Sequence, residues 1–119
     1  MIHSASETFA GNGTNYVGSR LRGRVHAVKV VADSSVTDNF DLTLTGETTE
    51  VPILVDATVA KTATTWFYPR VIPNKNTDGS AFTDATADIH VLNERIKVVA
   101  ANAGATGVIT VTVFFDSEE

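Results

Sequence analysis

Cysteine is absent from this chain, and proline is scarce, with three residues among 119. Without cysteine there can be no disulfide, no thiolate nucleophile and no cysteine-based zinc site. This composition is consistent with synthesis in a reducing cytosol. A chain of this length fits one ordinary domain, which can bury enough surface to hold a hydrophobic core without covalent cross-links.

Positive charge is also in short supply, because nine lysines and arginines face 14 aspartates and glutamates, for a formal net charge of −5. An acidic chain repels phosphate backbones, so we expect no nucleic-acid partner. No stretch approaches the ~20 consecutive apolar residues of a membrane-spanning helix, so we expect no membrane partner. Residues 1–10 lack the basic and apolar regions of a secretory signal, and none is predicted.

Recognisable catalytic motifs are missing. The sequence has no GxSxG nucleophile elbow, no phosphate-binding P-loop and no HExxH zinc motif. Its histidines are His3, His26 and His90. His26 and His90 are flanked by apolar residues of predicted strands, a setting more typical of structural histidines than of a metal ligand or a general base. The sequence therefore predicts a protein that is not an enzyme.

Three aspartates form the best candidate cation site, because Asp78, Asp84 and Asp88 follow Pro73 at short intervals. Calcium takes about six to eight oxygen ligands, and loop sites carry closely spaced acidic residues around a glycine. Gly79 follows Asp78, but the further acidic positions of an EF-hand loop are absent. A solvated loop is favoured over a cation site, and we predict no metal and no cofactor.

Valine, threonine and alanine dominate the sequence and occur in short alternating segments. Residues 39–46 and 107–116 show period-two alternation, which is typical of strands with one face toward a core. Leu42, Val98 and Val111 stand at apolar positions of such segments and are predicted to be buried. Further strands are predicted at 9–17, as an edge strand broken by Gly11 and Gly13, and at 24–32, 51–56, 64–68, 89–92 and 95–100.

Short strands separated by turns, with no long amphipathic helix among them, predict an all-β fold. The spacing of these strands fits a β-sandwich or a barrel, and the architecture we expect is a single antiparallel β-sandwich, of which a jelly-roll-like order is one form. Residues 20–119 are assigned to this domain, and residues 1–19 to an N-terminal arm able to contact a partner. Within the arm, the Asn-Gly-Thr segment at 12–14 is interpreted as a turn.

A run of arginines is the first candidate for protein recognition. Arg20, Arg22 and Arg24 recur at every second position, so on a strand they would form a basic stripe on one face. Arginine is suited to planar contacts with carboxylates across an interface. The alternative is a solvated, charged edge that resists pairing with other strands.

An aromatic segment is the second candidate, with Trp66, Tyr68 and Arg70 as its interface residues. Aromatic residues and arginine are enriched among the anchors of protein interfaces. On a strand, Trp66 and Tyr68 face away from Phe67, so one side is expected in the core. The alternative is an aromatic strand that serves the core alone. Residues 69–88 then form a loop of a length that is usually functional or disordered.

Seven segments follow one another in an order that resembles small virion proteins from the structural gene clusters of tailed bacteriophages. The likeness extends over about residues 20–116, and the first residues of the chain depart from it. The segments are GRVHAVKVV at 23–31, FDLTLT at 40–45, PIL at 52–54, WFYPR at 66–70, NTDGSA at 76–81, ERIKVV at 94–99 and GVITVTV at 107–113.

The resemblance implies a β-sandwich decoration, or cement, protein that binds the major capsid protein and stabilises the shell by protein–protein contacts. It also implies residence in the virion, after assembly in the host cytoplasm. We expect a homo-oligomer, specifically a trimer, because a closed ring pairs exposed strand edges and matches a threefold capsid position. The alternatives are a neck or tail component, a carbohydrate-binding module of a phage fibre and, third, an enzyme.

Overall fold

The computed structural model describes residues 1–71, 79–81 and 86–117. This part of the chain forms strands and turns, with no helix. The predicted all-β class is confirmed, and it follows from the abundance of β-branched residues, which pack well on a pleated surface. The strands are β1 (Ile2–Ala10), β2 (Gly13–Ala32), β3 (Phe40–Gly46), β4 (Pro52–Val59), β5 (Thr64–Phe67), β6 (Ile89–Ala101) and β7 (Val108–Ser117).

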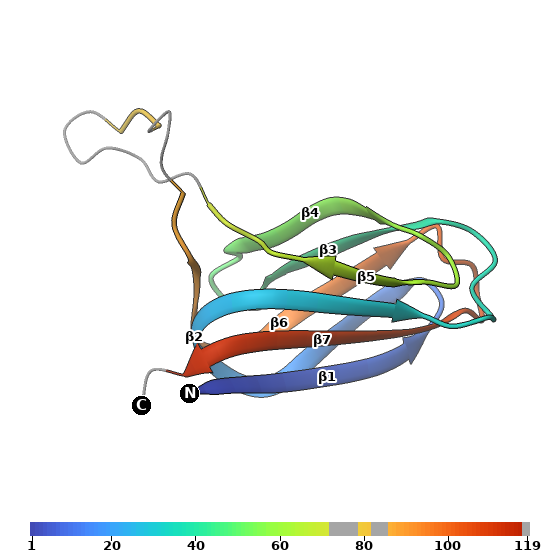
Figure 1. Ribbon diagram of the computed structural model, residues 1–119, viewed down its shortest axis with the longest axis horizontal. Coiled ribbons are helices and arrows are strands. Elements are labelled where there is room, and N and C mark those ends of the chain that lie inside the picture. The colour runs from blue at the N-terminus through green and yellow to red at the C-terminus, as the bar shows by residue number, and fades with distance from the viewer. Residues whose placement is uncertain (72–78, 82–85, 118–119) are drawn as a thin grey trace.

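The strands build two layers that share β2 (Figure 1). They pair antiparallel in the order β1-β7-β2-β6-β3-β4, and β5 pairs with β2. The first part of β2, residues 13–17, pairs with β6, whereas its last part, residues 28–31, lies between β7 and β5. One layer is therefore β1-β7-β2-β5 and the other β2-β6-β3-β4. The predicted antiparallel β-sandwich is confirmed, with layers joined through β2 rather than forming the separate sheets of a jelly roll.

Irregular positions let β2 serve both layers. Gly18 has a φ of 73°, which suits glycine, and the pairing of β2 with β6 slips just after Val17. Asn93 of β6, near this slip, also has a positive φ of 58°. A second slip between Val25 and Ala27 makes the residue between them a bulge against β7. Bulges bend a strand and increase its twist, so one chain segment can pass from one layer to the other.

The core lies between the two layers and consists of aliphatic and phenylalanine side chains in one cluster. In β7, Ile109, Val111 and Val113 are buried, while the threonines between them face outward. The predicted burial of Leu42, Val98 and Val111 is confirmed, since each is fully shielded from solvent. Period-two alternation in the sequence therefore located the core face correctly.

The N-terminal region is where the predicted strands differ most from the structure. The break predicted at Gly11 is present, but residues 9–17 are not one edge strand, because the turn at Gly11 and Asn12 separates the end of β1 from the start of β2. Residues 2–10 pair along their whole length with β7, and the assigned boundary between residues 19 and 20 falls inside β2. The segments predicted at 89–92 and 95–100 form one strand, β6, with a bulge at Asn93.

Candidate functional site

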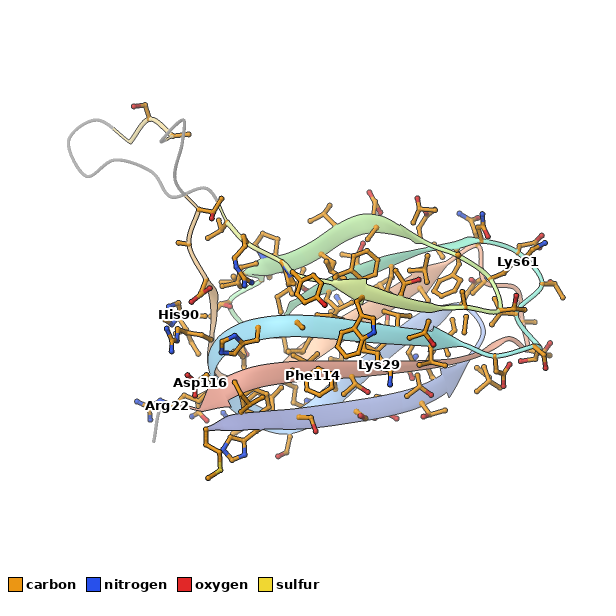
Figure 2. All side chains as sticks on the ribbon, in the orientation of Figure 1. Arg22, Lys29, Lys61, His90, Phe114 and Asp116 are labelled. Carbon is orange, nitrogen blue, oxygen red and sulfur yellow. The ribbon has the colours of Figure 1, made fainter. Side chains whose placement is uncertain are left out.

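The outer face of the β1-β7-β2-β5 layer carries an exposed aromatic pair. Trp66 of β5 is 45% exposed, and its ring stacks on that of Phe114 in β7 with centroids 5.5 Å apart. The ammonium of Lys29, the cross-strand partner of Trp66, lies 5.6 Å from the centre of the Trp66 ring. Figure 2 shows Lys29 and Phe114 on the same side of this layer. A cation over an aromatic face is attracted by the ring quadrupole, so Lys29 helps to orient Trp66.

Hydroxyl groups continue this face toward the edge of the sheet. The hydroxyls of Ser6 and Thr112 are 2.7 Å apart, and those of Thr8 and Thr110 are 2.9 Å apart, across the β1–β7 pair. Together with Lys29, Trp66 and Phe114, these four residues define the aromatic–hydroxyl face. Large aromatic rings such as Trp66 and Phe114 are enriched among the anchors of protein interfaces, so this face is the candidate interface of the layer.

The other members of the predicted aromatic segment lie beyond this face. Phe67 packs against the core, while Trp66 and Tyr68 are exposed, which confirms the predicted alternation. Tyr68 follows the end of β5 and is 66% exposed. Lys29 and Phe114 were not predicted from the sequence as interface residues. The available signal was Phe114 itself, a large aromatic residue on the outward side of β7.

An arginine–aspartate cluster, made of Arg24, Arg70, Asp88 and Asp116, lies at one end of the sandwich. The Nη2 atom of Arg24 donates a hydrogen bond to Asp116 Oδ2 at 2.8 Å, and the Nη1 atom of Arg24 lies 3.6 Å from Asp88 Oδ2. Arg70 Nε lies 3.5 Å from the other oxygen of Asp88. Two of the predicted interface arginines are therefore brought together through Asp88, which joins the end of the 69–88 segment to β2.

The terminal amine completes this cluster. The amino group of Met1 donates to Asp116 Oδ1 at 2.9 Å. Hydrogen bonds from this amine and from Arg24 hold the pKa of Asp116 below its ordinary value, against the opposing effect of burial. His26 Nε2 lies 4.0 Å from Asp116 Oδ2 and has no hydrogen-bond partner among the described residues. The cluster ties the start of β1 and the end of β7 to β2.

A second cluster of polar side chains surrounds an open depression of about 470 Å³ at the bend of β2. We call it the corner pocket; its lining is Ser19, Arg20, Glu47, Thr48, Glu94 and Arg95. Arg95 binds Glu47 through two hydrogen bonds of 2.6 Å, and its guanidinium lies 4.0 Å from the ring centre of Tyr16. The bond from Arg95 lowers the pKa of Glu47. These contacts pair the charges of Arg95 and Glu47 with each other.

Glu94 is the buried charged residue of the described chain, at 5% exposure. Its carboxylate accepts hydrogen bonds from the backbone amides of Thr48 and Thr49, at 2.7 and 3.0 Å, and from the Thr49 hydroxyl at 2.7 Å. Burial raises the pKa of Glu94, but the hydrogen bonds from Thr49 and Thr48 outweigh it, and the pKa lies below its ordinary value. Glu94 therefore holds the β3–β4 turn onto β6.

The three arginines of the predicted basic stripe are exposed at alternating positions, as expected, but they differ in the contacts they make. Arg20, Arg22 and Arg24 are exposed and alternate with buried Leu21 and Gly23. Arg20 Nη1 donates to the carbonyl of residue 93 at 3.1 Å, and Arg24 is held by the arginine–aspartate cluster. Within the described part of the chain, Arg22 has no ion-pair partner within 4 Å. The contact of Arg20, Arg22 and Arg24 with another protein stays a prediction.

Those candidate metal and catalytic residues that the structure describes do not form a common site. Asp78 and Asp84 lie outside the described residues, and Asp88 is engaged by two arginines. His3 stacks on Phe115, with ring centres 5.7 Å apart. Among the described residues, no three His, Asp or Glu side chains are grouped closely enough to hold a metal ion. In the same part of the chain, no helix is long and apolar enough to cross a bilayer.

Comparisons with known proteins relate this chain to others by fold. No family model and no curated protein sequence matches it. A solved structure entitled "Cyanophage Pam1 capsid asymmetric unit" contains a chain that superposes with a TM-score of 0.54 at 16% sequence identity. The match covers 99% of this chain and 84% of that chain. The two chains therefore share a fold over nearly their whole lengths and are of similar size.

Proposed function

We propose that this protein is a structural component of a tailed-phage virion that decorates the capsid and stabilises it through contacts with the major capsid protein. The observation that supports this most strongly is the fold shared with a chain of a cyanophage capsid asymmetric unit, over 99% of this chain and 84% of that one. The resemblance of residues 20–116 to small tailed-phage virion proteins points the same way. A rigid sandwich that presents an interface-like face is suited to such a role.

The aromatic–hydroxyl face is the docking surface in this proposal. It carries Trp66, the chain's one tryptophan, and its charge is limited to Lys29. The outer face of the other layer instead carries charged side chains, including Asp41, Arg95 and Lys97. Large aromatic anchors contribute most of the binding energy at protein interfaces, so Trp66 is expected to be a principal contact.

Stabilisation would follow from mass action. A protein that binds the assembled shell, and not free subunits, stabilises each site by about 2.7 kcal/mol at a hundredfold excess over its dissociation constant. Contacts that bridge neighbouring subunits multiply this effect through effective concentration. The predicted trimer would present three such faces on one symmetry axis, and the oligomeric state is tested separately below.

The test is cosedimentation with phage capsids that lack this protein. The wild-type chain should pellet with them and raise their melting temperature. Trp66→Ala should weaken binding by about 2 kcal/mol or more, the cost of removing an interface anchor. Val55→Ala, which trims an exposed apolar side chain of β4, is the matched control and should bind normally. Equal binding by both variants would show that the docking surface does not include Trp66. A wild-type chain that does not bind capsids would contradict the decoration role.

A carbohydrate-binding module is the second candidate function, because the exposed Trp66 ring beside Phe114 is also a platform on which a sugar could stack. A glycan array separates the two. Binding of a glycan that Trp66→Ala abolishes, together with no affinity for capsids, would favour the fibre module. Binding to a purified tail in place of the head would favour the neck or tail alternative.

A further inference from the structure

β1 is the most regular exposed strand edge of the sandwich. It ends the strand order and pairs with β7 alone. Its nine residues pair without a slip, from Ile2 opposite Asp116 to Ala10 opposite Val108. Natural edges are usually blunted by proline, lysine or a bulge. β1 contains none of these, so its outer side is a continuous template for another strand.

The hydrogen-bond pattern identifies which backbone groups face outward. Gly11 N donates to Gly107 O at 2.8 Å, which makes these residues a hydrogen-bonded pair at the end of the β1–β7 ladder. Because such pairs alternate, every second residue of β1 bonds to β7 and the others point to the free edge. The bond from Asp33 N to Val108 O, on the far side of β7, agrees with this alternation. The residues whose amide and carbonyl groups face the free edge are Ile2, Ser4, Ser6, Thr8 and Ala10.

The other edges are poorer templates. β4 begins at Pro52, has a positive φ of 47° at Asp56, and slips twice in its pairing with β3. β5 has four residues and is followed closely by Pro69. A head-to-tail ring needs two compatible edges on each copy, whereas a twofold dimer needs one. Among the described strands, β1 alone offers a long and regular edge, which favours twofold pairing there.

We propose that β1 pairs antiparallel with β1 of a second copy, about a twofold axis that passes beside Ser6. In this register Ser6 faces its own counterpart, Ser4 faces Thr8 of the second copy, and Ile2 faces Ala10. The five residues whose backbone groups point outward then bond to one another, and all nine residues of both strands are used. Registers shifted toward either end leave part of the edge unpaired.

The one charged side chain of β1 fits this register. Glu7 lies on the inner side of β1, opposite Val111, and is half-buried. An inward charge of this kind deters pairing with an arbitrary strand. In the proposed dimer Glu7 faces the small Ala5 of the second copy, and its diagonal neighbours on that copy are His3 and the second Glu7. Like charges directly opposite each other destabilise a sheet, and this register avoids that contact.

The dimer would pair the β1 edges of two copies, so that their outer faces lie side by side and form one surface. Their β1-β7-β2-β5 layers become one continuous layer, with the two aromatic–hydroxyl faces on the same side. The exposed hydroxyls of Ser4, Ser6 and Thr8 then lie in a row across the junction. The inference concerns self-association and does not depend on the capsid role.

Cysteine cross-linking tests the register directly, because the chain has no cysteine of its own. The Cα atoms of a hydrogen-bonded antiparallel pair lie about 5.5 Å apart, within the range that a disulfide spans. Oxidised Ser6→Cys should therefore run as a dimer on a non-reducing gel. The control is Ser4→Cys, whose two copies would be separated by four residues along the strand, about 14 Å. It should remain a monomer on the gel.

Sedimentation tests the pairing without a cross-link. The amide of Ser6 points to the free edge, so Ser6→Pro should leave the β1–β7 bonds intact while raising the dimer dissociation constant at least about tenfold. Ser6→Ala retains the amide and should dimerise like the wild type. A monomer at about 50 μM whose Ser6→Cys variant does not cross-link would overturn the inference. So would a trimer that Ser6→Pro leaves unchanged, and that result would support the trimer predicted from the sequence. If Ser6→Pro fails to fold, the contrast between the two cysteine variants still decides.

Discussion

Replacing Glu94 by alanine should destabilise the protein more than any other single change to a charged residue in the described chain. The substitution removes three hydrogen bonds to the β3–β4 turn. Hydrogen bonds to a charged group contribute about 1.5–3 kcal/mol each, but the freed amides at the rim of the corner pocket regain water. We therefore expect a loss of about 3 kcal/mol. Glu94→Gln keeps an acceptor oxygen and should cost about half as much.

Urea denaturation, followed by the fluorescence of the single tryptophan, measures these losses. The matched control is Glu47→Gln, which breaks the more exposed pair with Arg95 and should cost less than about 1 kcal/mol. A midpoint for Glu94→Ala within error of the wild type would refute the assignment of Glu94 as the residue that holds the turn.

The same experiment at low pH tests the charge of Glu94. The pKa of Glu94 is lowered in the folded state, so its ionised form stabilises the protein above the ordinary carboxyl pKa of about 4.3. This contribution is lost as pH falls through the lowered folded-state pKa. The stability difference between the wild type and Glu94→Gln should therefore be largest at neutral pH and shrink in acid. An equal difference at pH 7 and pH 3 would contradict this explanation.

Gly46 provides an independent check on the same contact. A Cβ at Gly46 would lie 2.5 Å from Glu94 Oε1 and 2.7 Å from Thr49 Oγ1, so Gly46→Ala must displace the carboxylate or the turn. The cost of Gly46→Ala should be smaller in the Glu94→Ala background, because part of the clash is then gone. Additive costs in this double-mutant cycle would mean that the two residues do not interact.

Three further outcomes are expected. Leu42→Ala should cost about 2–5 kcal/mol in the same denaturation assay, because it leaves a cavity in the core; an unchanged midpoint would contradict the burial of Leu42. Asp116→Asn should lower the melting temperature at pH 7 and lower it less in acid, because the contribution of ionised Asp116 is lost as pH falls through its lowered folded-state pKa. Replacing His26 and His90 together by glutamine should leave capsid binding intact, and loss of a stoichiometric metal in that variant would contradict the absence of a metal role.

Local sequence patterns accounted for much of the fold. The alternation in residues 39–46 and 107–116 depends on the two-residue period of a strand, which the chain carries without reference to its neighbours. It placed Leu42 and Val111 in the core, and both are fully buried. It also placed Trp66 and Phe67 on opposite faces of β5, as the structure has them.

β1 and the long β2 could not be predicted in the same way. Most of residues 2–10 are small or polar, so their alternation is weak, and they become a strand because β7 offers a matching edge 98 to 114 positions away. β2 continues past Gly18 because bulges let it pair with β6 and then with β7. Non-local hydrogen bonds of this kind leave no periodic trace in either segment.

The sequence by itself determined that this chain is cysteine-free, acidic and all-β, and which faces of its clearest strands are apolar, because composition and period-two alternation are local properties. The tertiary structure decided which distant residues meet: Trp66 with Phe114, Glu94 with the turn at Thr48 and Thr49, and Asp116 with Arg24 and the terminal amine. It also decided that β1 lies at a free edge with Ser6 at its centre. Strand order and register depend on which edges pair during folding, and that choice is made by long-range contacts across the whole chain.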